Sequence, residues 1–98
     1  MNAIPDEITT IQKELIDMLH FPNKEVLSGA EKIKRRKDEA KRAMMLGNSS
    51  SNHKVKIVFE DTTGKKMVET TVWGVTDRYM LLKKGMTIPL NRIHEIII

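Results

Sequence analysis

The sequence predicts an α+β fold, in which an N-terminal helical arm of two helices precedes a five-strand antiparallel unit, either a small β-barrel or a strongly bent sheet. Up to Gly47, apolar residues recur at spacings of three and four, as on one face of a helix. From Val55 onward, apolar and polar residues alternate as in strands, and short turns separate the runs. We therefore divide the chain into a helical arm (1–47), a flexible linker (48–53) and a β-unit (54–98).

The two helices follow from terminal signals and apolar spacing. The first is expected to begin at Pro5, which suits the first helical position, and to end before Pro22. Its apolar stripe consists of Ile8, Ile11, Leu15, Met18 and Leu19. The second is expected from Ser28, whose spacing to Glu31 matches a capping box, to Gly47, a left-handed C-cap. Because its apolar face is narrow, we expect it to be docked lightly, ordered by a partner or partly frayed.

The strands of the β-unit follow from alternation and turn residues. The five predicted strands begin at Val55 and continue over 67–76, 79–83, 86–88 and 93–98. Gly74 indicates a bend or bulge that lets the second strand serve two halves of a curved sheet, and a tight turn over 89–92 precedes the last strand. This β-prone last strand needs a cover, either the first strand, which would close a barrel, or another subunit.

The composition limits the class of protein. The chain has 98 residues and no cysteine, which excludes disulfides, thiolate zinc ligands and a cysteine nucleophile. No basic residue precedes an apolar run at the N-terminus, and no apolar stretch approaches membrane-spanning length. We therefore expect a cytoplasmic protein without a membrane partner.

Catalytic and metal-binding patterns are not found in the sequence. His20, His53 and His94 are scattered, and His94 and Glu95 point to opposite faces of a strand, so they make no metal pair. No Gly-x-x-x-x-Gly-Lys loop occurs, and the linker serines have no neighbouring base. We predict no catalytic residue, no metal and no cofactor, and no small-molecule substrate is evident from the sequence. An enzymatic role would need a partner to supply the chemistry.

Positive charge is confined to one segment. The net charge is +4, and residues 31–42, with seven basic and three acidic residues, contain the whole excess. A basic helix of this kind can neutralise phosphates and bind RNA or another polyanion weakly and in a salt-sensitive way. The candidate contacts are Lys32, Lys34, Arg35, Arg36, Lys37, Lys41 and Arg42.

The same segment also fits a solvated helix that pairs its own charges. Four pairs of opposite charge fall at i,i+4: Glu31 with Arg35, Lys34 with Asp38, Arg35 with Glu39, and Asp38 with Arg42. The chain has only four aromatic residues on which bases could stack. The sequence leaves both readings of the helix open.

Three residues of the β-unit are possible contacts with a partner. Trp73 suits either the core or a surface anchor, and we expect the core. Arg78 and Arg92 fall in turns, where functional contacts collect.

Asp77, Met80 and Leu82 resemble the Asp-x-x-Met-x-Leu stretch of the Sm-like RNA-binding family, and 88–96 is similar to its closing segment. More broadly, the order and spacing in 54–98 resemble SH3-like and Sm-like barrels, in which five strands follow an N-terminal helix. The resemblance implies a small barrel that binds RNA.

The chain departs from that family at two positions where such a protein would hold a base. Thr71 stands where the family usually has glycine, and Asn91 and Arg92 stand where it has an Arg-Gly or Lys-His pair. Our leading hypothesis is a non-enzymatic binding or adaptor module that contacts RNA or another polyanion through its basic helix. The alternative is a protein–protein or homo-oligomeric module that uses the first helix and the C-terminal strand.

Overall fold

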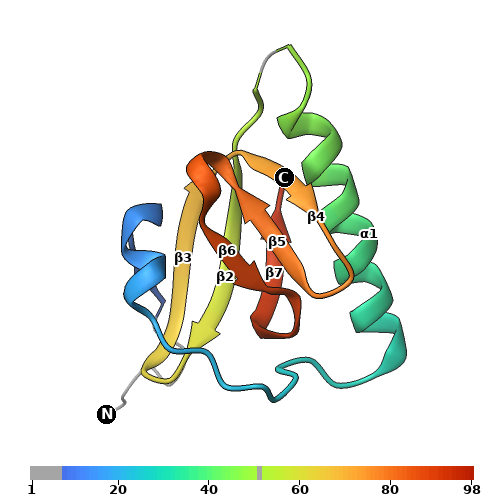
Figure 1. The fold of residues 1–98 in the computed structure, drawn as a ribbon. Coiled ribbons are helices and arrows are strands. Elements are labelled where there is room, and N and C mark those ends of the chain that lie inside the picture. The colour runs from blue at the N-terminus through green and yellow to red at the C-terminus, as the bar shows by residue number, and fades with distance from the viewer. Residues whose placement is uncertain (1–7, 51) are drawn as a thin grey trace.

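The structure, a computed structural model, describes residues 8–50 and 52–98 (Figure 1). In chain order its elements are β1 (Thr9–Thr10), η1 (Lys13–Met18), α1 (Ala30–Gly47), β2 (Val55–Asp61), β3 (Gly64–Thr70), β4 (Val72–Val75), β5 (Tyr79–Leu82), η2 (Lys83–Gly85), β6 (Thr87–Pro89), η3 (Leu90–Arg92) and β7 (Ile93–Ile97). The strands form a four-stranded sheet, β1-β3-β2-β7, and a three-stranded sheet, β4-β5-β6. The predicted α+β class is confirmed.

β2 lies at the centre of the four-stranded sheet. It pairs antiparallel with β3 on one side and with β7 on the other. Val55, Ile57 and Phe59 are buried, as the alternation along this segment predicts. The sequence allowed two partners for the C-terminal strand, the first strand of the β-unit or another subunit. In the structure the C-terminal strand pairs with the first strand of the β-unit.

The long strand predicted over 67–76 is divided between the two sheets. β3 ends at Thr70 and β4 begins at Val72, so the chain changes sheet at the buried Thr71. The expectation that this run serves two halves of a bent sheet is confirmed, but the change comes before Gly74. At Gly74 the β4–β5 pairing shifts register relative to Val72, which is the bulge that the glycine predicted.

The two sheets do not close into a barrel over the described residues, and the predicted number of five strands is wrong, because β1 and the divided second strand raise it to seven. Helical elements join the sheets instead. α1 packs against β4 and β7, one strand from each sheet, and η1 packs against β3 and β6, again one from each.

The first predicted helix is wrong over residues 8–21, and its predicted start at Pro5 lies outside the described residues. Thr9 and Thr10 instead form β1, which pairs parallel with β3, and a six-residue 3₁₀ helix, η1, follows. β-branched threonines suit a strand, and the edge of β3 supplies a partner, since the backbone N–H of Ile11 donates to the carbonyl of Met67 at 2.9 Å. Local apolar spacing could not reveal this distant edge.

The second predicted helix is confirmed as α1, but both of its expected ends differ. It begins after Gly29, and no side chain caps it, so the capping box at Ser28 is wrong. Gly47 lies within the helix without a positive φ, and Asn48 follows as the C-cap, so the left-handed cap is also wrong. A Cβ on Gly47 would collide with the carbonyl oxygen of Val72. The glycine therefore permits close packing of α1 on β4.

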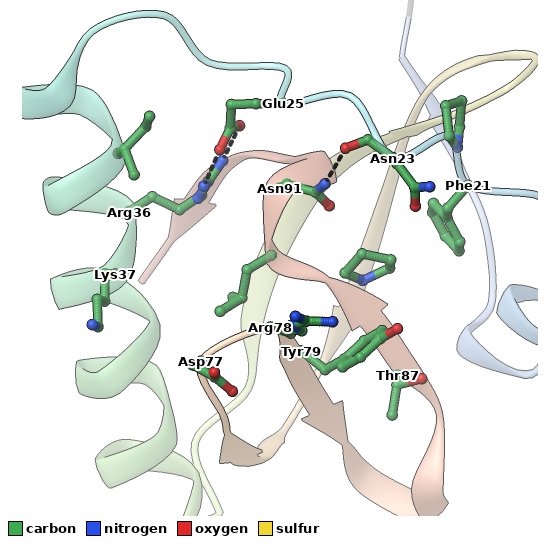
Figure 2. A pocket seen from close by; sticks show the side chains of 14 residues that line it. Phe21, Asn23, Glu25, Arg36, Lys37, Asp77, Arg78, Tyr79, Thr87 and Asn91 are labelled. Atoms are coloured by element: carbon green, nitrogen blue, oxygen red, sulfur yellow. Dashed lines mark hydrogen bonds and ion pairs between the residues drawn. The ribbon is translucent and has the colours of Figure 1, made fainter.

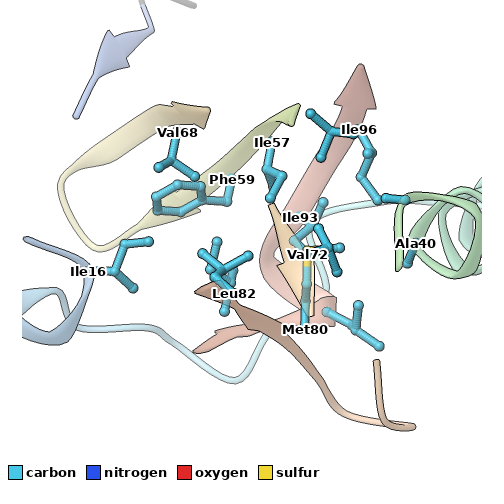
Figure 3. Close-up of a cluster of buried hydrophobic side chains, with 14 residues drawn as sticks. Ile16, Ala40, Ile57, Phe59, Val68, Val72, Met80, Leu82, Ile93 and Ile96 are labelled. Carbon is cyan, nitrogen blue, oxygen red and sulfur yellow. The ribbon is translucent and has the colours of Figure 1, made fainter. Parts of the chain in front are cut away.

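One core joins the helices and both sheets (Figure 3). Ile16 of η1 and Ala40 and Ala43 of α1 are buried in it, so small side chains bring α1 onto the sheets. The strands and η3 contribute Val55, Ile57, Phe59, Val68, Val72, Met80, Leu82, Ile88, Leu90, Ile93 and Ile96. The sequence left open whether the helical arm packs on the β-unit. In the structure, α1 packs on it.

Candidate functional site

α1 exposes six of the seven predicted cations and buries Arg36. The Arg36 side chain is 7% exposed, and its Nη1 and Nη2 each donate to a carboxylate oxygen of Glu25 at 2.6 Å. Nη1 also donates to the carbonyl of Ile93 at 3.1 Å. These hydrogen bonds from Arg36 hold the pKa of Glu25 below its ordinary value, against the opposing effect of partial burial. Arg36 therefore fixes the fold and is not presented to a ligand.

The exposed cations form two rows on opposite flanks of α1. Lys34, Lys37 and Lys41 follow at spacings of three and four, so they lie along one flank, which we call the lysine row. Within this row, Lys34 Nζ pairs with Asp38 at 2.9 Å, the one predicted i,i+4 pair that the described residues form.

The second row is mixed in charge. Lys32, Arg35 and Arg42 lie on the other flank together with Glu39. This flank borders a shallow hollow of about 330 Å³, whose wall also includes Glu95 of β7. Asp38 stands among the lysines as Glu39 stands among these cations, and Glu95 adds a second acid beside the mixed row.

A cleft of about 750 Å³ adjoins the lysine-row flank (Figure 2). One wall is the segment 21–25, a second is the first half of α1, and the third is the β4–β5 turn with β6 and η3. The lining residues are Phe21, Pro22, Asn23, Glu25, Ile33, Arg36, Lys37, Asp77, Arg78, Tyr79, Thr87, Pro89, Leu90 and Asn91. A hollow of this size lies within the range of small-molecule sites.

Long-range hydrogen bonds hold the segment 21–25 in place. Asn91 Nδ2 donates to the carbonyl of Asn23 at 2.6 Å, as Figure 2 shows. Arg92 donates from Nη1 to the carbonyl of Lys24 at 2.7 Å and from Nε to that of Glu60 at 3.0 Å. Arg92 is 5% exposed, so this predicted turn contact is a buried structural residue.

The cleft brings together polar and aromatic groups that the sequence did not connect. Tyr79 is 47% exposed and lies beside Arg78 at the mouth, with Lys37 on the opposite wall (Figure 2). Arg78 is therefore the one predicted partner contact of the β-unit that lines the cleft. Glu25, Asn23 and Asn91 were missed because their roles depend on contacts between distant segments. The alternation of Tyr79 with buried Met80 was the one local signal that Tyr79 faces outward.

Trp73 lies on β4, outside the cleft lining. It is 44% exposed, so the expectation that it belongs to the core is wrong. Trp73 directly follows Val72, which is fully buried, so the alternation of side chains along β4 places Trp73 on the outer face. Leu81 of the paired strand is 36% exposed, so the outer face of this sheet is partly apolar.

Metal ligands do not gather in residues 8–50 and 52–98, where no group of three or more His, Asp or Glu side chains could hold an ion. His94 Nε2 lies 2.7 Å from Glu60 Oε1, within hydrogen-bonding distance. In the same residues no helix has the length and apolar character needed to cross a bilayer.

Comparison with known proteins leaves the resemblance of 54–98 to SH3-like and Sm-like barrels as a prediction. No protein-family model, curated protein or solved structure matches this chain.

Proposed function

We propose that this protein is a non-enzymatic binding module that contacts RNA or another polyanion through the lysine row of α1. The observation that carries the proposal is the arrangement of Lys34, Lys37 and Lys41 on one exposed flank, where three lysines stand against a single acid, Asp38. Such a row can follow a phosphate backbone, because successive ammonium groups lie along the helix axis. The rigid packing of α1 on both sheets supports the contact by fixing the row in space.

The number of lysines in the row sets the expected salt dependence of binding. Three phosphate contacts with a single strand give a salt slope of about −2 in a plot of log K against log salt. Affinity is thus weak and falls steeply as salt is raised. Base specificity is not part of this proposal, because phosphate contacts carry no sequence information.

Fluorescence anisotropy with a labelled single-stranded RNA at two salt concentrations tests the proposal. The triple variant K34Q/K37Q/K41Q should abolish binding. The matched variant K32Q/R35Q/R42Q loses the same charge from the other flank and should bind RNA more strongly than the triple lysine variant does. Equal losses of RNA affinity in both variants would mean that binding depends on net charge alone and not on which flank carries it. The absence of any binding by the native protein at low salt would end the proposal.

Self-association remains the second candidate, and the C-terminal strand favours it. Ile97 and Ile98 are each 43% exposed at the end of β7, which lies at the edge of the four-stranded sheet. The predicted stripe of the first helix is divided, since Ile8, Leu15 and Met18 are exposed, whereas Ile11 and Leu19 pack against the core. Light scattering coupled to size-exclusion chromatography separates the candidates, because a monomer at all concentrations excludes self-association.

A further inference from the structure

The cleft beside α1 has the properties of a site for a small molecule, which is a role separate from that of the lysine row. We propose that it binds a small organic anion that carries one carboxylate or phosphate group on a flat apolar body. The proposal rests on three features of the cleft: its apolar walls, its two unpaired cations and its fixed shape.

The walls supply apolar surface from three separate segments. Phe21 and Pro22 come from the segment before α1, Ile33 from α1 itself, and Pro89 and Leu90 from the end of β6 and the start of η3. Phe21 is held by a tilted ring contact with the core residue Phe59, with 5.9 Å between ring centroids. With Tyr79 at the mouth (Figure 2), these walls suit a ring better than an extended polar chain.

The charges of the cleft leave two cations for an anion. Glu25 and Arg36 satisfy each other through two hydrogen bonds of 2.6 Å, so their charges cancel. Lys37 and Arg78 are exposed, and neither forms a hydrogen bond or an ion pair through its side chain in the described part of the chain. Asp77 opposes them, which leaves one net positive charge at the mouth. A small group with one or two negative charges matches this better than a polyanion does.

The shape of the cleft is fixed before any ligand arrives. Asn91 and Arg92 hold the backbone of the segment 21–25, and the Glu25–Arg36 pair ties this segment to α1. A preformed site spares a ligand the cost of ordering its walls. Weak binding should therefore be measurable even for a molecule as small as a substituted ring.

The cleft and the lysine row share Lys37, but Arg78 belongs only to the cleft and Lys41 only to the row. This difference separates the two proposals. Arg78→Gln should weaken binding of the organic anion, and Lys41→Gln should leave it unchanged. If RNA binding is not observed at all, the prediction for the organic anion still stands.

Titration of the ¹⁵N-labelled full chain, followed by two-dimensional NMR, tests the inference with matched probes. Phenyl phosphate and phenylacetate carry both the ring and the anion, inorganic phosphate carries the anion alone, and phenol carries the ring alone. At least one of the first two should shift the amide signals of Arg78, Tyr79 and Asn91, with a Kd on the order of 1 mM. The tighter of the two identifies the anionic group.

The variants give the direction of each effect. Lys37→Gln and Arg78→Gln should each weaken binding about threefold, as expected for exposed charges, and Asp77→Asn should strengthen it about twofold. Lys56→Gln, on the exposed face of β2, is the control and should have no effect. The inference is overturned if neither ring-bearing anion shifts these signals, or if inorganic phosphate or phenol alone binds as tightly.

Discussion

Arg36 of α1 binds Glu25 through both of its Nη atoms, at 2.6 Å each, and the same guanidinium donates to the carbonyl of Ile93 at the start of β7. One buried side chain thus connects three segments: α1, the start of β7 and the segment 21–25 that forms one wall of the cleft. The seven cations of 31–42 look alike in the sequence, but this one has a structural role that the others do not have.

Replacement of Arg36 by Met should destabilise the protein by about 3 kcal/mol, because Glu25 and the Ile93 carbonyl both lose their partner. The Glu25 side chain is 30% exposed, so water offsets part of the loss. Urea denaturation measures the change. Arg35→Met removes the same charge from an exposed position of α1 and should cost less than about 0.5 kcal/mol. Equal costs for the two variants would show that the pair does not stabilise the fold.

Stability should fall on acidification, because Glu25 and Asp61, which are partly or fully buried, have lowered pKa values in the folded state. Hydrogen bonds from Arg36 lower the pKa of Glu25 from its ordinary 4.5. Burial alone would raise the pKa of Asp61, but hydrogen bonds from Lys66 and Thr63 outweigh it and lower the pKa below 3.8. The unfolded chain therefore takes up these protons first as the pH falls.

The stabilisation from both groups is complete above their unfolded pKa values and is lost as the pH falls through the folded ones. Urea denaturation between neutral pH and about pH 3 should show this decline. Glu25→Gln should flatten part of it, because an amide does not titrate. A variant with the same acid dependence as the native protein would rule out Glu25 as a contributor.

The sequence predicted the β-unit well because its strands depend on local alternation and turn residues. β2, β5, β6 and β7 lie where Val55 onward predicted them, and η3 is the expected tight turn. The N-terminal segment failed because its structure depends on distant partners. Thr9 and Thr10 pair with β3, and Ile16 packs in a core formed by strands far along the chain.

The candidate site was predictable only in part for the same reason. The charge count located the cations of α1, but not which of them the fold would bury. Two contacts join residues that are too far apart in the sequence for a local pattern to predict them. Arg36 pairs with Glu25, and Arg92 donates to the carbonyl of Lys24. The cleft exists because these contacts hold 21–25 opposite the β4–β5 turn, and no local pattern encodes such a position.

Gly47→Ala should destabilise the protein, although alanine favours a helix by about 1 kcal/mol over glycine. The added Cβ would collide with the carbonyl oxygen of Val72, a backbone atom that cannot move without shifting β4. The steric cost should prevail, with a net loss of about 1 to 2 kcal/mol in urea denaturation. Lys41→Ala, at an exposed position of the same helix, is the control and should be neutral or slightly stabilising. A gain for Gly47→Ala would show that α1 does not pack closely on β4.

Trp73 should behave as a surface residue, and its fluorescence reports this directly because it is the single tryptophan of the chain. At 44% exposure, its emission should be quenched by acrylamide much more readily than that of a core tryptophan. Trp73→Thr should cost less than about 1 kcal/mol, whereas Phe59→Ala, in the core, should cost about 4 kcal/mol. If quenching weakens as protein concentration rises, the outer face of β4 and β5 is covered by another copy of the chain. If quenching is weak at every concentration, Trp73 is buried and the alternation along β4 does not turn it outward.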